Sequence, residues 1–294
     1  MEGIVLSKRN NQMKGDTMNL HALVVAMTTS LVLWPTVALA APFDFSTGSP
    51  DGLMATASRP DSPGKIEIES ADDFILASQT RIDHATFTGL LPSGTPLSNV
   101  GAVGVEIYRV FPKDSDTVRT AQVPTRANSP SDVAFTSRDS ATAGLGFTVS
   151  LLNSSFTTAN SVLNGIHPFP SQTTDGEGPV TGQEVQFNVD FLTPLNLPAD
   201  HYFFIPQVQL ATGDFLWLSA PKPTVPPFAP DLQTWIRNAN LAPDWLRVGT
   251  DIVGKGAFNG TFSLSGETVA VPLPGAVVLA GLGLLLAARR REYE

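Results

Sequence analysis

The chain has 294 residues, with 18 basic and 27 acidic side chains and a formal net charge of −9. This acidic balance excludes a nucleic-acid binder, which needs a basic surface, and the absence of cysteine excludes disulfides, thiolate metal sites and a cysteine nucleophile. Lys and Glu, which commonly occupy exposed helix faces, number only 6 and 9, so a mainly helical protein is not expected.

The N-terminal segment, residues 1–40, is predicted to be a secretory signal peptide. Three basic residues precede an uncharged, mostly apolar run of 13 residues (22–34), and Ala38 and Ala40 follow as an A-x-A cleavage site. Cleavage is expected after Ala40. A permanent membrane anchor is the alternative, but 13 residues are few for a span, which needs about 20.

Residues 41–269 are predicted to form one β-sandwich ectodomain. The segment 181–191 alternates strictly, with Val185 and Phe187 on one face and Glu184 and Gln186 on the other, which is typical of a half-buried strand. Further strands are expected at 65–69, 73–77, 82–90, 103–111, 146–151, 202–210, 215–219 and 258–264.

Helix is expected only in two short pieces of this domain, 158–164 and 231–238, with Asp231 as the N-cap of the second. Turn residues separate many short strands, and no βαβ rhythm is present. The fold class is therefore predicted to be all-β, an antiparallel β-sandwich or jelly roll. From 41 to 288 the chain has 12 basic and 23 acidic residues, a net charge of −11.

Residues 270–294 are predicted to be a C-terminal sorting tail that contains a single transmembrane helix. The 18 residues 271–288 have no charged or polar side chain and would reach about 27 Å as a helix, close to one bilayer core. A buried core helix is the alternative. Arg289, Arg290 and Arg291 end the run, and by the positive-inside rule they stay cytoplasmic and leave the upstream chain outside.

The tail combines a proline-containing motif, a short Gly/Leu/Ala-rich span and a terminal arginine cluster, on a chain with a signal peptide. It resembles the PEP-CTERM sorting signal of Gram-negative bacteria that make exopolysaccharide. The motif positions are Val271, Pro272, Leu273 and Pro274, and because Leu273 stands where the common form has Glu, the tail is closer to the VPLP-type variant. The resemblance implies recognition and release by an exosortase, a membrane cysteine protease-transpeptidase.

The order of several strand motifs also resembles the exported β-sandwich ectodomains that often precede such tails. These motifs are an Asp-Asp-Phe strand (72–74), an Ile-Tyr strand (107–108), a Trp-Leu-Ser strand (217–219) and a closing Phe-x-Leu-x-Gly strand (262–266). This resemblance implies a fold and no particular chemistry.

No catalytic residue is predicted. The sequence has no G-x-S-x-G nucleophile elbow, no H-x-x-x-H or H-E-x-x-H zinc spacing and no Gly-rich phosphate loop after a strand. His84 and His201 are expected to be structural or surface residues. The chain is therefore predicted not to be an enzyme, and the alternative of a secreted hydrolase has no motif behind it.

Three pairs of acidic residues are the candidate metal ligands, and no other cofactor is expected. Asp72 with Asp73, Asp114 with Asp116, and Asp175 with Glu177 could supply carboxylate oxygens to Ca²⁺, although none of these pairs has EF-hand spacing. Acidic turns that face water are the alternative.

The three tryptophans outside the signal peptide, Trp217, Trp235 and Trp245, lie within 29 positions. They could form a platform on which sugar rings stack, or they could close the end of a hydrophobic core.

The expected function is that of an exported, non-enzymatic cell-surface or extracellular-matrix protein. The Sec machinery and signal peptidase would take it across the inner membrane, its C-terminal helix would anchor it transiently in the membrane, and an exosortase would release it. The alternative is a module that binds exopolysaccharide through Trp217, Trp235 and Trp245. Nucleic acid is not expected as a partner.

Overall fold

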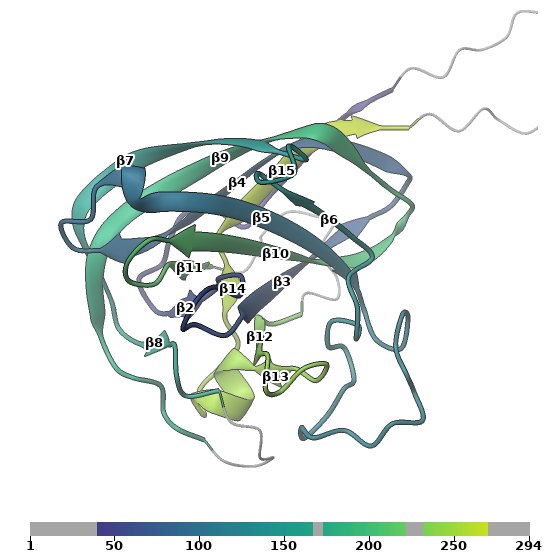
Figure 1. Ribbon diagram of the computed structural model, residues 1–294. Helices are drawn as coiled ribbons and strands as arrows, with labels where there is room; N and C mark the ends of the chain where they lie inside the picture. The colour runs from purple at the N-terminus through teal and green to yellow at the C-terminus, as the bar shows by residue number, and fades with distance from the viewer. Residues whose placement is uncertain (1–39, 167–172, 222–231, 270–294) are drawn as a thin grey trace, which may run out of the picture. The chain divides into compact units, whose positions relative to one another are not determined.

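The computed structural model describes residues 40–166, 173–221 and 232–269, and in these residues the chain is all-β. Its strands form two mainly antiparallel sheets, of nine and six strands (Figure 1). This architecture confirms the prediction of an all-β chain and is consistent with a β-sandwich. Residues 40–270 make one compact unit.

The nine-stranded sheet is built around β4 (Thr80–Pro92) and β9 (Val180–Leu197), which pair along almost their whole length. β7 (Gly146–Thr158) lies on the other side of β9. The remaining strands lie on the other edge of β4, directly or through one another: β15 (Phe262–Thr268), β1 (Pro42–Ser46), β11 (Leu216–Ala220), β14 (Asn259–Gly260), β2 (Ala55–Ala57) and β8 (Ser161–Val162).

The six-stranded sheet has β3 (Ile68–Leu76) and β10 (Asp200–Leu210) at its centre. β5 (Val100–Arg109) and β6 (Thr136–Asp139) continue it beyond β10, and β12 (Trp235–Asn238) and β13 (Leu246–Arg247) continue it beyond β3. A short 3₁₀ turn, η1 (Leu97–Asn99), leads into β5, and a single π-helical turn, η2 (Val248–Ile252), follows β13.

The main core lies between the inner faces of the two sheets. As the alternation in 181–191 predicts, Val185 and Phe187 are fully buried in it, while Glu184 and Gln186 face outward. Aromatic rings fill the space between the sheets: Phe204 of the six-stranded sheet stacks on Phe262 of the nine-stranded sheet, with ring centroids 4.9 Å apart and an angle of 4° between the planes.

Trp217 needs a glycine beside it to fit this core. A Cβ atom added to Gly260 would lie 2.3 Å from the Trp217 ring, so only glycine leaves room for the indole. The indole N–H donates to the carbonyl of Thr261 at 2.8 Å, which satisfies the buried polar atom.

Besides the main core the described residues form two smaller clusters of buried apolar side chains, and the smaller of these, which we name the second core, lies on the outer face of the six-stranded sheet. Ala71, Phe203 and Ile205 project from the sheet and pack with Trp235 and Trp245. The cover is formed by two segments that we name the β5–β6 loop (110–135) and the β12–β13 turn (239–245). In Figure 1 the β5–β6 loop is the long blue-teal loop at the lower right.

Two predicted helices are wrong. Within 158–164 the structure has the short strand β8, which pairs in parallel with β2, and residues 235–238 form β12, which pairs with β3 and β13. Trp235, Ile236 and Arg237 are all buried, so β12 shows no polar-apolar alternation from which a strand could be recognised. The proposed N-cap Asp231 lies outside the described residues.

Other strand boundaries also differ from those predicted. The segments expected at 65–69 and 73–77 both overlap one strand, β3 (Ile68–Leu76), while residues 65–67 lie outside it. β3 is buried on both faces although it contains four Glu, Asp and Ser side chains. The segment expected at 258–264 is divided between β14 and β15. Within the described ranges no helix is long and apolar enough to cross a membrane, and the predicted span 271–288 lies outside them.

Candidate functional site

The residues predicted for processing at the two ends lie almost entirely outside the described part of the chain. This applies to Ala38, to the motif Val271, Pro272, Leu273 and Pro274, and to Arg289, Arg290 and Arg291. Ala40, the last residue of the predicted signal peptide, is described and is exposed.

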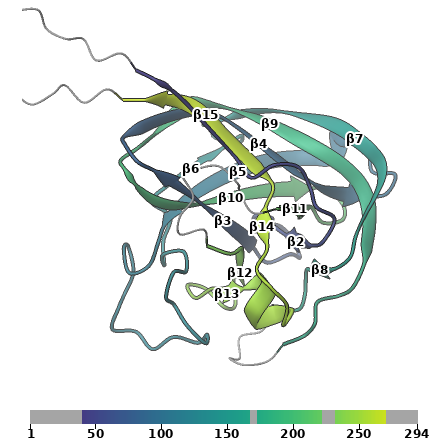
Figure 2. The same ribbon diagram turned by 180° about the vertical axis from the view of Figure 1, so that it is seen from behind.

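The structure does show where the domain meets both terminal segments. β1, the first strand, pairs antiparallel with β15, the last, in a register from Pro42 opposite Glu267 to Ser46 opposite Ser263. Figure 2 shows the two strands side by side. At the end of this ladder the Thr268 amide donates to the Ala41 carbonyl at 2.8 Å, and the Ala41 amide donates to the Thr268 hydroxyl at 3.2 Å. Residues 41 and 268 therefore leave the domain at the same place.

The three tryptophans do not form a platform. Trp217, Trp235 and Trp245 are each only 1% exposed, Trp217 between the sheets and the other two in the second core. The Trp245 indole N–H donates to the Ser131 carbonyl at 3.2 Å, and its ring meets Tyr108 edge-on. Buried indole faces cannot stack on a sugar ring, so the structure contradicts sugar binding through these residues and matches the alternative, closure of a core.

Asp72 and Asp73 are buried and engaged by protein donors. Asp72 accepts from the Gly260 amide at 2.8 Å, and Asp73 accepts from the Leu232 amide at 2.9 Å and lies 2.6 Å from Nε2 of His201. Both carboxylates fasten neighbouring segments to β3.

Asp114 and Asp116 of the β5–β6 loop are likewise engaged, Asp114 by the end of β5 and Asp116 by the loop itself. Arg109 holds Asp114 in a two-point ion pair, and this hydrogen bonding keeps the pKa of Asp114 below its usual value. Asp116 accepts from the Val118 amide at 2.9 Å and so closes a turn. Among the described residues, no group of three or more His, Asp or Glu side chains is arranged to hold a metal ion.

A buried ion-pair network on the outer face of the six-stranded sheet was missed by sequence reasoning. Arg237 of β12 forms a two-point ion pair with Glu69 of β3, and its guanidinium also donates to the Tyr108 hydroxyl at 2.8 Å. The guanidinium lies 4.3 Å from the centroid of the Trp245 ring, a cation–π contact. Glu69 and Arg237 are 168 positions apart, so no local motif could indicate the pair.

Glu106 of β5 completes this network. Its carboxyl group lies 2.9 Å from the Tyr108 hydroxyl, which is also 3.0 Å from Glu69. A phenol has one proton, so it can donate to only one of the two carboxyl groups. Burial, and then the nearby charge of Glu69, raise the pKa of Glu106 to about 7. A protonated Glu106 can donate to Tyr108 while Tyr108 donates to Glu69, which satisfies all three groups.

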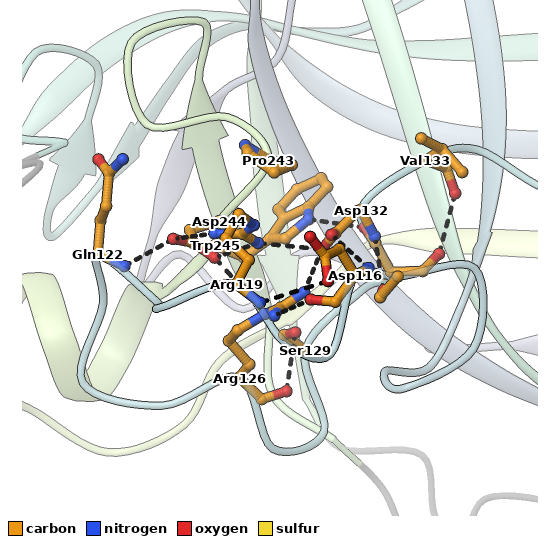
Figure 3. Close-up of polar contacts among 12 residues, drawn as sticks. Asp116, Arg119, Gln122, Arg126, Ser129, Asp132, Val133, Pro243, Asp244 and Trp245 are labelled. Carbon is orange, nitrogen blue, oxygen red and sulfur yellow. Dashed lines mark hydrogen bonds and ion pairs between the residues drawn. The ribbon is translucent and has the colours of Figure 1, made fainter.

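A second ion-pair cluster fastens the β5–β6 loop to the β12–β13 turn (Figure 3). Asp244, whose side chain is fully buried, accepts two hydrogen bonds of 2.8 Å from Arg119 and one of 2.7 Å from the Gln122 amide. Arg126 lies 3.6 Å from Asp244 and bridges to Asp132 at 2.5 Å. Burial alone would raise the pKa of Asp244, but the hydrogen bonds from Arg119 and Gln122 outweigh it and lower the pKa.

The two clusters are joined through Arg237, which also donates to the backbone carbonyls of Asp132 at 3.3 Å and Pro243 at 3.4 Å. Each charged group in the clusters is paired with a partner of the opposite charge or with a polar group. The arrangement therefore fastens two long segments over the sheet.

Two histidines pair singly with acids, His201 with Asp73 and His84 with Asp190, the latter at 3.0 Å. These contacts also join residues far apart in sequence.

Comparison with known proteins gives no relative: no protein-family model, no curated protein and no solved structure matches this chain.

Proposed function

We propose that this chain is an exported, non-enzymatic protein of the cell surface or extracellular matrix, and that an exosortase reads its C-terminal tail at Val271–Pro274. The order of signal peptide, domain, proline motif, apolar span and arginine cluster supports this route. The buried, mutually compensated ion pairs of the domain support a structural role over catalysis.

The observation that carries the proposal is the β1–β15 ladder. Cleavage after Ala40 and release near Val271 would remove both terminal segments and leave every residue of this ladder in place, including Ala41 and Thr268. The main core lies wholly between these two residues. Processing at both ends is therefore compatible with an intact domain.

Mass spectrometry of the exported protein tests the proposal. We expect an N-terminus at Ala41 and no peptide from the apolar span in secreted material. The double variant Pro272→Ala/Pro274→Ala should keep its tail and accumulate in the membrane fraction. The control Pro63→Ala makes the same change in an exposed loop of the domain and should be released like the wild type. An intact peptide spanning Gly275 to Arg291 in secreted wild-type protein would contradict the proposal.

A further inference from the structure

A hollow of about 370 Å³ lies on the outer face of the nine-stranded sheet. This face is open at the hollow, whereas the outer face of the six-stranded sheet is covered by the β5–β6 loop and the β12–β13 turn. Its volume is within the range of small-molecule sites, about 300–1,000 Å³. We name it the hydroxyl hollow. Its polar lining includes Thr86 and Thr88 of β4, Glu184 and Gln186 of β9, and Thr261 and Ser263 near β15.

The period-two pattern of three neighbouring strands puts these groups together. Thr86 lies opposite Ser263 in the β4–β15 ladder, and their hydroxyls are 2.6 Å apart. Thr88 lies opposite Gln186 in the β4–β9 ladder. Because side chains alternate between the faces of a strand, the polar groups face outward and the intervening Phe87 and Phe187 face the core.

The side wall of the hollow is held in place by the sheet. It consists of Gly48, Ser49 and Pro50, which follow β1. The Thr47 hydroxyl donates to the Gly260 carbonyl at 2.7 Å and accepts from the Phe262 amide at 2.9 Å. Gly48 has φ +92°, a conformation that favours glycine, and its amide donates to the Ser46 hydroxyl at 3.1 Å. A fixed wall lowers the ordering cost of binding a ligand.

The floor has unused capacity for hydrogen bonds. Within the described part of the chain, the side chains of Glu184, Gln186 and Thr88 form no hydrogen bond or ion pair with protein groups. An amide and a hydroxyl can each donate and accept, and a carboxylate can accept from two hydroxyls at once. Partial burial raises the pKa of Glu184.

We propose that the hydroxyl hollow binds a neutral, hydroxyl-rich ligand, an uncharged saccharide. Each sugar hydroxyl both donates and accepts, as the Thr, Ser and Gln side chains of the floor do. Among the described residues that line the hollow, Glu184 is the only charged one, so no cation is present to bind an anionic ligand. The exposed side chain of Leu152 at the rim offers an apolar surface to the C–H groups of a sugar ring.

An extended peptide fits the hollow less well. Peptides commonly bind a sheet through free backbone groups at its edge, but the hollow lies over β4, β9 and β15, whose backbones pair with one another.

The test uses the full chain purified in detergent and the outer-face variants Gln186→Ala and Glu184→Ala. The probes are neutral gluco-, manno- and galacto-oligosaccharides, an oligouronate and an uncharged extended peptide, with binding measured by calorimetry and saturation-transfer NMR. We expect binding of at least one neutral saccharide, weakened about tenfold or more by each variant, since a tenfold change corresponds to the loss of one good hydrogen bond.

The matched control is Asn188→Ala, which removes the same amide group from the same strand and face, two residues from Gln186 and outside the lining of the hollow. It should bind like the wild type. The proposal is overturned if wild-type protein binds no neutral saccharide at millimolar concentration, if only the oligouronate or the peptide binds, or if the hollow variants bind as tightly as the control. Because the measurement needs no processing of the tail, its failure would leave the proposed export route untouched.

Discussion

The outer faces of the two sheets carry polar side chains in opposite ways. On the six-stranded sheet, Glu69 and Arg237 are charged groups buried under two long segments, and the titratable Glu106 beside them is half-buried. On the nine-stranded sheet, Thr86, Gln186 and Ser263 are neutral polar groups left open around a hollow whose lining has one charged side chain, Glu184. A covered face needs compensated charges, because a buried charge without a partner is costly. An open face can keep polar groups that have no partner within the protein, because water can reach them.

The largest loss of stability is expected on removal of the Arg237 guanidinium, which lies beneath the β5–β6 loop and the β12–β13 turn. Arg237→Met should lower the free energy of unfolding by about 4 kcal/mol, because Glu69 stays buried without its partner. Chemical denaturation measures this loss. The control Arg81→Met breaks an ion pair on the open nine-stranded sheet, where both side chains are more than 40% exposed, and should cost less than about 1 kcal/mol.

A second variant distinguishes loss of the pair from loss of packing. In Arg237→Met/Glu69→Leu both members of the ion pair are replaced by apolar groups, so most of the stability should return. If Arg237→Met and Arg81→Met lower the free energy of unfolding equally, burial of an ion pair under the two segments does not make it more important for stability than an exposed pair.

The second largest effect is a dependence of stability on pH. Glu106 keeps its proton in the folded protein up to a pH of about 7, whereas in the unfolded chain it loses the proton near 4.5. Between these values the folded state binds more protons, so the free energy of unfolding should fall as the pH rises, by at most about 3 kcal/mol. Above pH 7 this contribution is lost.

Denaturation midpoints measured from pH 5 to pH 8 check this dependence. Glu106→Gln should make the midpoint nearly constant, apart from a smaller fall caused by Glu67 and Glu184, whose pKa values are also raised by burial. Asp244 and Asp114 affect stability in a different pH range. Their pKa values are lowered below 3.8, so the stability that their ionised forms contribute is lost only in more acidic solution. A midpoint that rises from pH 5 to pH 7 would contradict the network described for Glu106.

The smallest effect is expected on the open face itself. Thr148 of β7 is exposed and its side chain makes no hydrogen bond with the described residues. Thr148→Val should change the free energy of unfolding by less than about 0.5 kcal/mol, as usual for exposed sites. Thermal and chemical denaturation measure it, and a loss above 1 kcal/mol would mean that this face is covered after all.

The alternation of polar and apolar side chains predicted β9 correctly. In β9, Val185 and Phe187 alternate with Glu184 and Gln186, and the structure buries the expected side. β3 and β12 are buried on both faces, so β3 was divided into two predicted strands and β12 was taken for a helix. Periodicity reports only a difference between two faces and so does not define β3 or β12, although β10 and β11, which are also buried on both faces, were predicted near their observed bounds.

For the site residues, too, the sequence predicted what depends on residue type and missed what depends on distant contacts. The tryptophans could be named from the sequence, but their burial depended on the β5–β6 loop and the β12–β13 turn. Neither ion-pair cluster was predicted, because Arg119 and Asp244 are 125 positions apart and Glu69 and Arg237 are 168 apart. The lining of the hydroxyl hollow comes from five strands (β1, β4, β7, β9 and β15) and the segments beside them, and these residues form no motif in the sequence.

The all-β class, the core side of the alternating strands and the acidic charge of the domain could be predicted without the structure, because they depend on composition and on near neighbours along the chain. The sequence also supplied the prediction of an export route from its two apolar ends. The folded structure was needed to show which sheet face is covered, which charges are paired and where the two ends of the domain meet. Those outcomes depend on contacts between segments more than a hundred residues apart, which local periodicity does not encode.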